Sequence, residues 1–150
     1  MKKSFAILTV LLLSVPSARA ATCTTANSIV KVKNLKLGSQ ERVEFYIKTP
    51  FTGSVVVAAA SSGTFIQDGS GNPIVVVGNR WTDVKFKSMY WTCSSLTLFS
   101  LPKPILKDIQ LIGQFEGQIE YAIGRHNGHY LSQTSSTSGG VKKITLKYGP

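Results

Sequence analysis

The chain has 150 residues, with 17 lysines and arginines against 7 acidic residues and a formal net charge of +10. Without the N-terminal segment described next, about 130 residues remain, which is enough for one domain with a buried core and excludes a second. The positive charge favours anionic partners such as wall polymers, lipopolysaccharide, acidic lipid or nucleic acid, although it would equally serve solubility alone.

Residues 1–20, "MKKSFAILTVLLLSVPSARA", have two lysines, an apolar stretch and a small-residue end at Ala18 and Ala20. This order predicts a secretory signal peptide, followed by a domain at residues 21–150 that is exported to the periplasm or the exterior. A retained membrane anchor is the alternative, but the apolar run is about ten residues against the roughly twenty that span a bilayer. Removing Lys2, Lys3 and Arg19 leaves 14 of the 17 basic residues against 7 acids.

Two cysteines follow the signal segment, Cys23 and Cys93. Disulfides persist in exported proteins, so we expect one Cys23–Cys93 bridge. A reactive thiol is the alternative, but no base lies near either cysteine in the sequence and the even number leaves none over.

Short β-rich runs separated by turn residues fill the rest of the chain, and no helical period is long enough to predict a helix. This pattern predicts an all-β, single-domain antiparallel β-sandwich of about eight to ten strands. Residues 28–37 and 41–50 form the first expected hairpin, with a β-bulge at Asn34 where the alternation of apolar residues changes parity.

The middle of the chain predicts further strands. "SVVVAAA", residues 54–60, is apolar on both faces and therefore indicates a central strand covered on both sides. "DGSGNP", residues 68–73, is a dense turn signal between two short strands. Residues 81–91 alternate, with Val84 and Phe86 expected to face the core.

The last third begins with "LPKP", residues 101–104. Its two prolines cannot donate hydrogen bonds within a sheet, so we expect this segment to cross from one sheet to the other. Strands at residues 107–113 and 117–124 follow, with inward side chains at Ile109, Leu111, Ile119, Tyr121 and Ile123. Residues 132–140, "SQTSSTSGG", are expected to form a polar, flexible loop before a final strand at residues 141–149.

The two histidines, His126 and His129, flank Asn-Gly, the strongest two-residue hairpin signal. We therefore expect a hairpin tip that exposes Arg125, His126 and His129. Three interpretations stay open: a plain turn, a pH-dependent surface patch, and a metal site. The last would need at least a third protein ligand, so we expect neither metal nor cofactor.

The sequence has few features that are typical of an enzyme. No nucleophile elbow, phosphate loop, dinucleotide fingerprint or Cys/His cluster occurs in the sequence. Glu116 and Glu120 would project to the same face of an extended strand, but each is expected to pair with a lysine on a neighbouring strand rather than act as an acid or base. We therefore predict that the protein is not an enzyme.

Lysines opposite the apolar residues of the expected strands are the remaining signal. If several of these strands share a sheet, their outer face would form a basic surface for a polyanion, with Tyr46 or Trp81 available to stack on a sugar ring; otherwise the lysines are solvated charges that discourage edge-to-edge aggregation. The candidate lysines are Lys31, Lys33, Lys85, Lys87, Lys142 and Lys147.

Short motifs carry a family resemblance over roughly residues 30–147. "ERVEF", "VVVG", "FEG" and "IG" occur in the order seen in the AMIN-like domain family of exported bacterial proteins, related to the N-terminal targeting domain of cell-wall amidases. The resemblance implies a compact β-sandwich in the cell envelope and, for the amidase relatives, peptidoglycan binding. The matching positions are Arg42, Phe115, Glu116, Gly117 and Gly124.

At these positions "FEG" would place Phe115 in the core and use Gly117 for a bulge or tight bend. The chain departs from the family in its final strand, "KKITLKYG", in having no attached amidase or secretin domain, and in its expected disulfide. Those departures weigh more against wall binding than against the fold.

Together these observations predict an exported, non-catalytic binding module of the bacterial envelope that contacts an anionic wall or surface glycan through its lysine-rich strands; nucleic acid is not the expected partner. The alternative is a secreted effector or inhibitor that binds another protein through residues 125–140. A metal-dependent hydrolase around His126 and His129 is the least favoured hypothesis.

Overall fold

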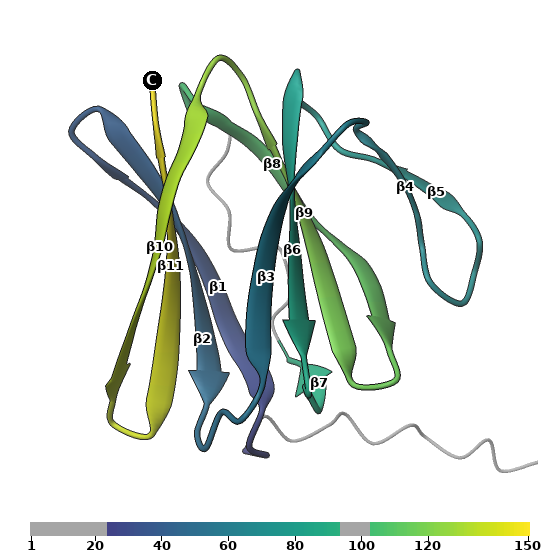
Figure 1. Ribbon diagram of the computed structural model, residues 1–150, viewed down its shortest axis with the longest axis vertical. Helices are drawn as coiled ribbons and strands as arrows, with labels where there is room; N and C mark the ends of the chain where they lie inside the picture. The colour runs from purple at the N-terminus through teal and green to yellow at the C-terminus, as the bar shows by residue number, and fades with distance from the viewer. Residues whose placement is uncertain (1–23, 94–102) are drawn as a thin grey trace, which may run out of the picture.

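The computed structural model describes residues 24–93 and 103–150 and is all-β over these residues (Figure 1). No helix in these two ranges is long and apolar enough to cross a membrane. The described strands are β1 (Ser28–Leu37), β2 (Gln40–Lys48), β3 (Ser54–Ala60), β4 (Thr64–Ile66), β5 (Pro73–Val75), β6 (Arg80–Lys87), β7 (Trp91–Thr92), β8 (Leu106–Phe115), β9 (Gln118–Arg125), β10 (His129–Ser138) and β11 (Val141–Gly149).

Two large sheets contain most of these strands. The first has five strands in the order β10-β11-β2-β1-β7 and the second has four in the order β3-β6-β9-β8, while β4 and β5 form a separate hairpin. Neighbouring strands are antiparallel except for β1 and β7, which are parallel. In Figure 1 the four longer strands of the five-stranded sheet lie on the left and its short strand β7 at the bottom, the four-stranded sheet lies in the centre and the β4–β5 hairpin on the right.

One hydrophobic core contains residues of both large sheets. Phe45 of β2 contacts Phe86 of β6 and Tyr121 of β9, with ring centroids 4.9 and 5.1 Å apart. Val84, Phe86, Ile109, Ile119, Tyr121 and Ile123 are buried in this core, and Leu111 packs against it. The predicted inward faces of β6, β8 and β9 are therefore confirmed.

A second, smaller cluster lies on the outer face of the four-stranded sheet. There Ile112 and Ala122 pack with Val76, while Phe65, Ile74 and Trp81 cover them. The loop between β4 and β5 contains "DGSGN", residues 68–72, and Pro73 begins β5, as the turn signal predicts. This hairpin therefore covers part of a sheet face that would otherwise expose apolar side chains.

The first hairpin is confirmed, but its bulge is not at Asn34. β1 and β2 pair continuously from Lys31 to Leu37, and the register shift lies between Ile29 and Lys31. Asn34 is buried on the same face as Val32. The prediction was wrong because a buried polar residue at an inward position resembles a change of parity.

The strand at residues 54–60 is also placed differently. Among the described strands β3 pairs with β6 alone and forms the edge of its sheet. Val55 and Val57 pack against the core, whereas Val56 is exposed. A run that is apolar on both faces therefore does not identify a central strand here.

Residues 132–138 form a regular strand rather than the expected loop. They belong to β10, which pairs with β11 from Ser132 to Ser138, and Gly139 and Gly140 make the two-residue turn between these strands. Both glycines have positive φ angles, 56° and 73°, as a type I′ turn requires. Hydrophobic periodicity cannot detect β10 because serine, threonine and glutamine occupy both of its faces.

Three predictions lie wholly or partly outside the described residues. Cys93 is not a free cysteine, but Cys23 precedes the described range. The signal segment at residues 1–20 and the first half of residues 101–104 also lie outside it.

Candidate functional site

Three of the six candidate lysines lie on one surface, the outer face of the five-stranded sheet. In β2 the side chains of Val43, Phe45 and Ile47 enter the core, so the alternate residues point outward. Strand register places Lys31, Lys33 and Lys147 on the same outer side. Three further cations, Arg42, Lys48 and Lys143, complete what we call the basic face: Lys31, Lys33, Arg42, Lys48, Lys143 and Lys147.

The sequence interpretation missed Arg42 as a ligand contact, along with Lys48 and Lys143, although a signal for them was present. Arg42 and Lys48 alternate with the core residues of β2, and Lys143 alternates with Ile144. Positions of this kind lie opposite the buried face. Which strands share a sheet, by contrast, comes only from the structure.

Lys142 does not join this face. It pairs with Ile47 in the register and alternates with Lys143, so it points toward the core side, where its ammonium lies 5.1 Å from the ring centroid of Phe51. Lys142 and Lys147 are five residues apart in one strand and therefore cannot point the same way. Placing both on one face was wrong.

Lys85 and Lys87 are on the other large sheet, in β6. The Lys85 ammonium is 3.1 Å from a carboxylate oxygen of Glu120 on β9, which confirms the expected pairing of that glutamate with a neighbouring lysine. The hydrogen bond with Glu120 also raises the pKa of Lys85. The six candidate lysines therefore do not form one surface.

Arg42 and Lys147 are the most informative pair on the basic face. They are directly opposite each other across β2 and β11, where like charges destabilise a sheet. Arg42 Nε is buried and has no hydrogen-bond partner among the described residues. Two adjacent cations, one with an unsatisfied donor, are an arrangement that an anion would stabilise.

Glu44 is the acid within the basic face, and its oxygens are occupied. One oxygen is 3.3 Å from the Lys143 ammonium and the other accepts the Tyr46 hydroxyl at 2.5 Å. Burial, together with Glu44, raises the pKa of Tyr46 to about 12. On the adjacent strand the neighbouring Lys33 ammonium lowers the pKa of Lys31. Glu44 thus neutralises little of the charge around Arg42, Lys31 and Lys147.

A shallow pocket of about 230 Å³ borders the basic face where β2, β10 and β11 meet. It is lined by Tyr46, Ser136, Ser138, Val141 and Lys143. The outward residues of β10 add hydroxyl groups next to the cations, because Ser132, Thr134 and Ser136 lie opposite Lys147, Thr145 and Lys143. The surface thus offers charge together with neutral hydrogen-bonding groups.

The two aromatic candidates for sugar stacking differ. Tyr46 lines the shallow pocket, and Lys33 lies 5.8 Å from its ring centroid. Trp81 is on the other sheet, where its indole nitrogen donates to the Val76 carbonyl at 2.9 Å and its ring packs in the smaller cluster. Trp81 is therefore a packing residue.

The histidine segment connects two sheets and does not form a hairpin. β9 belongs to the four-stranded sheet and β10 to the five-stranded sheet, so residues 126–128 cross between them at the top of Figure 1. Asn127 has a positive φ of 56°. Its side-chain oxygen accepts a hydrogen bond from the Asn79 amide, and its backbone N–H donates to the side-chain oxygen of Asn79. The Asn-Gly signal identified a turn correctly, but its hairpin interpretation was wrong.

This geometry also separates the three residues of the expected tip. Arg125 is buried, and its guanidinium donates to the Gly128 carbonyl. His126 and His129 are exposed, and Arg80 Nη1 is 3.1 Å from His129 Nδ1. Within the described residues no group of three His, Cys, Asp or Glu side chains could hold a metal ion.

The positions of the family motif have different roles. Arg42 belongs to the basic face. Phe115 was expected in the core but is 61% exposed. Glu116 and Gly117, with φ angles of 47° and 76°, form the tight turn between β8 and β9, which confirms the bend expected at Gly117. At Gly124, any Cβ would overlap the Val77 carbonyl oxygen, so the glycine permits close approach of that segment.

These features define an all-β protein with a basic sheet face. No protein-family model matches this chain, and no curated protein matches it either. The resemblance to the AMIN-like family therefore stays a prediction.

Proposed function

We propose that the protein is an exported, non-catalytic binding module of the bacterial envelope that holds an anionic wall or surface glycan on its basic face. The observation that carries the proposal is the Arg42–Lys147 pair, because two opposed cations and an unpartnered buried Nε would be stabilised by an anionic group between them. The other cations extend this surface across β1, β2 and β11.

The basic face suits a polymer better than a small anion. Its cations occupy three adjacent strands, and adjacent strands are about 4.8 Å apart. Repeating negative charges could therefore contact several cations at once, while hydroxyls of β10 and the pocket at Tyr46 contact the sugar rings. Each contact of this kind releases counterions, so affinity should fall as salt rises.

The fold proposed for this module is a β-sandwich closed by a Cys23–Cys93 disulfide. Support for the sandwich comes from the core that both sheets share. Support for the bridge comes from the parallel pairing of β1 with β7, because Cys93 follows β7 directly and Cys23 is five residues before β1. Mass spectrometry of unreduced peptides should find the two cysteines linked, and a free thiol at either position would contradict the bridge.

The binding experiment compares retention on purified cell wall that keeps its anionic polymers with retention on wall from which they have been removed. We expect salt-sensitive retention on the first material alone. Arg42→Gln and Lys147→Gln should each weaken binding and reduce the slope of log affinity against log salt by about one.

The matched control is Lys87→Gln, which removes the same charge from the exposed end of β6 on the other sheet. It should leave the slope unchanged. Retention that does not depend on salt, or an equal effect of Lys87→Gln, would contradict binding at the basic face.

One observation supports a second candidate function, binding of another protein. β10 lies at the edge of its sheet and pairs only with β11 among the described strands, so its free side could accept an extended segment of a partner. Such binding would survive Arg42→Gln and Lys147→Gln but be lost in Thr137→Lys, because a charged side chain on an edge strand opposes pairing.

A further inference from the structure

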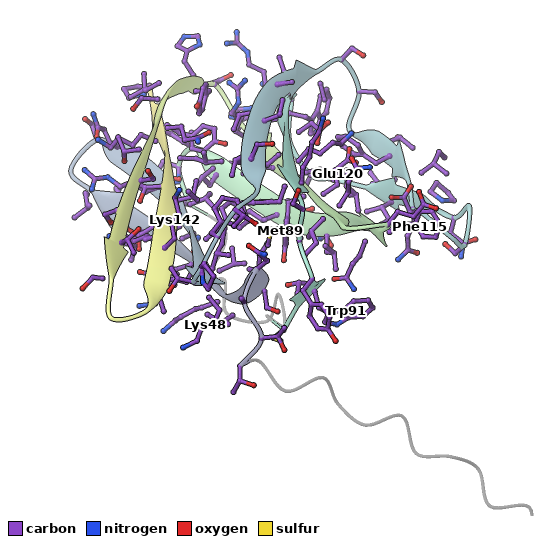
Figure 2. All side chains as sticks on the ribbon, turned by 60° about the horizontal axis from the view of Figure 1, so that its bottom comes forward. Lys48, Met89, Trp91, Phe115, Glu120 and Lys142 are labelled. Atoms are coloured by element: carbon purple, nitrogen blue, oxygen red, sulfur yellow. The ribbon has the colours of Figure 1, made fainter. Side chains whose placement is uncertain are left out.

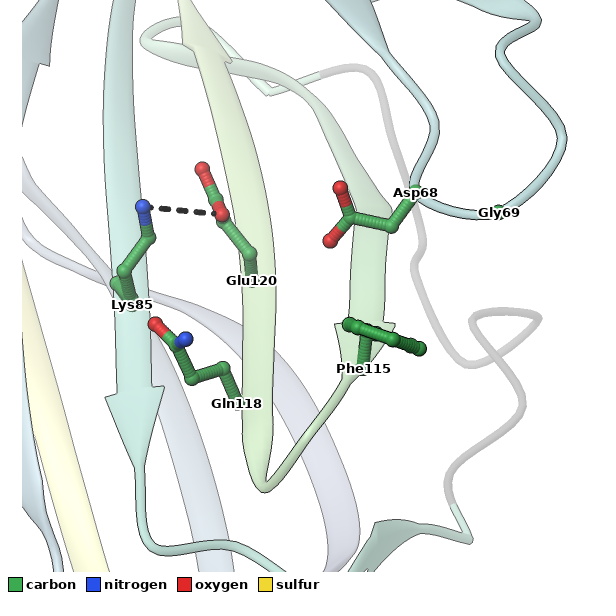
Figure 3. A pocket seen from close by; sticks show the side chains of 6 residues that line it. All are labelled: Asp68, Gly69, Lys85, Phe115, Gln118 and Glu120. Carbon is green, nitrogen blue, oxygen red and sulfur yellow. Dashed lines mark ion pairs between the residues drawn. The ribbon is translucent and has the colours of Figure 1, made fainter.

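Two pockets lie next to each other near the turn between β8 and β9. The larger, of about 480 Å³, is lined by Asp68, Gly69, Lys85, Phe115, Gln118 and Glu120 (Figure 3). The smaller, of about 180 Å³, shares Phe115 and Gln118 with it and also contacts Tyr90 and Trp91. Because two residues line both pockets, we treat them as one feature, the hairpin groove.

Three aromatic side chains at this groove are exposed. Tyr90 is 62%, Trp91 47% and Phe115 61% exposed. Figure 2 shows Phe115 and Trp91 on the side of the molecule away from Lys48 and Lys142. Folding gains little from rings that remain in water, so their clustering along a groove indicates a ligand that covers them.

The polar groups of the groove converge from three segments. Lys85 from β6 and Glu120 from β9 form the 3.1 Å ion pair, and Asp68 enters from the β4–β5 loop on the other side of Glu120 (Figure 3). Gly113 makes room for Asp68, because a Cβ at that position would overlap its carboxylate. Gln118 adds an amide with both a donor and an acceptor.

This combination of groups suits a ligand that has both hydroxyl groups and an apolar face. Carboxylates accept hydrogen bonds from hydroxyls, the ammonium and the amide donate to oxygens, and aromatic rings pack on the C–H face of a pyranose. Asp68, Glu120 and Lys85 together carry one net negative charge, which disfavours an anion. The volume lies within the range of about 300–1,000 Å³ that is typical of ligand pockets.

We propose that the hairpin groove binds a short neutral saccharide, with Phe115 and Trp91 packing on its rings and Asp68, Gln118 and Glu120 bonding its hydroxyls. This site is separate from the basic face, since its polar groups come from the four-stranded sheet and the β4–β5 loop and its charge has the opposite sign. Trp91 of β7 is the one groove residue named here that belongs to the five-stranded sheet. The two sites can therefore succeed or fail independently.

The test is a calorimetric titration of the purified protein with a panel of neutral mono- to tetrasaccharides, with gluco, manno and galacto configurations and with N-acetylated members. At least one should bind with an affinity that does not change between low and high salt. Phe115→Ala should weaken it at least tenfold, and Glu120→Gln should weaken it as well.

Leu131→Ala is the matched control for Phe115→Ala, because Leu131 is an exposed apolar residue on β10 of the other sheet. It should leave saccharide binding unchanged, and so should Arg42→Gln. The proposal is overturned if no panel member binds, if binding survives both Phe115→Ala and Glu120→Gln, or if Arg42→Gln abolishes it. None of these outcomes affects the salt-sensitive retention that tests the basic face.

Discussion

The carboxylate of Glu41 accepts the backbone N–H of Leu106 at 2.7 Å and that of Ile105 at 3.1 Å. Glu41 belongs to β2 of the five-stranded sheet, and Leu106 begins β8 of the four-stranded sheet. The side chain is 1% exposed. A carboxyl group buried to this extent requires hydrogen-bond donors, and the N–H groups of Ile105 and Leu106 supply them. The same two bonds hold the start of β8 against β2.

Replacement of Glu41 by alanine should therefore destabilise the protein strongly. Two buried N–H groups would lose their acceptor, at about 1–3 kcal/mol each, so we expect the unfolding free energy to fall by about 2–5 kcal/mol. Glu41→Gln should cost less, because its amide oxygen can still accept one bond. Urea unfolding measures both, and Glu116→Gln at the exposed β8–β9 turn is the control. Equal stability of Glu41→Ala and this control would contradict the role.

Gly124 provides a second stability prediction. A Cβ there would overlap the backbone carbonyl oxygen of Val77, which no side-chain rotation can relieve. Gly124→Ala should therefore lower the unfolding free energy by about 1–3 kcal/mol or more. In Gly38→Ala the added methyl meets no atom within 4 Å, but φ is +62°, so only a backbone cost of about 1–2 kcal/mol is expected. Thermal unfolding compares the two, and a smaller loss in Gly124→Ala would contradict the close approach.

The inward faces of single strands were predictable from the sequence, because alternation has a local cause. Val84 and Phe86 face the core since they alternate with charged residues in one short strand. The sheet assignment of each strand was not predictable in the same way. Asn127 and Gly128 would suit a hairpin between β9 and β10, yet these strands are in different sheets. A positive φ at Asn127 is compatible with both outcomes.

In the candidate sites, too, local features were predictable from the sequence and long-range contacts were not. The opposite orientations of Lys142 and Lys147 were predictable from the sequence, because residues five apart in one strand point to opposite faces. That Arg42 faces Lys147 depends on the long-range pairing of β2 with β11. The hairpin groove also depends on long-range contacts, because Asp68, Lys85 and Phe115 come from three segments that are separated in the sequence. Phe115 resembled a core residue, since aromatic character alone does not distinguish a buried ring from one at a binding surface.

Trp81 leads to a prediction about the β4–β5 hairpin. Its indole nitrogen donates to the Val76 carbonyl at 2.9 Å, and its ring covers the smaller hydrophobic cluster. Trp81→Phe removes this hydrogen bond and should cost about 0.5–1.5 kcal/mol. Hydrogen exchange should become faster at the Val76 amide, which bonds to the Gly63 carbonyl. Trp91→Phe makes the same change at an exposed ring and should leave both the unfolding free energy and the exchange rate unchanged. If exchange at Val76 were unaltered in Trp81→Phe, Trp81 would not hold the β4–β5 hairpin in place.

Asp83 should make stability depend on pH in an unusual direction. It lies on β6, and its Oδ1 is buried without a hydrogen-bond partner in the part of the chain that the structure describes. Burial, reinforced by Glu120 and opposed by Lys85, raises the pKa of the Asp83 carboxyl from 3.8 to about 6. Between these two pH values the folded protein keeps a proton that the unfolded chain has released. The contribution of Asp83 to the unfolding free energy therefore falls as pH rises through this window.

The measurement is the difference in unfolding free energy between the wild type and Asp83→Asn at several pH values. Because solvent screens the partly exposed carboxyl, we expect the wild type to lose about 1–2 kcal/mol relative to Asp83→Asn between pH about 4 and about 6. Above that window the difference between the wild type and Asp83→Asn should stay constant. Glu116→Gln should follow the wild type throughout. A difference that does not vary with pH would show that Asp83 ionises in the folded state as it does in the unfolded chain.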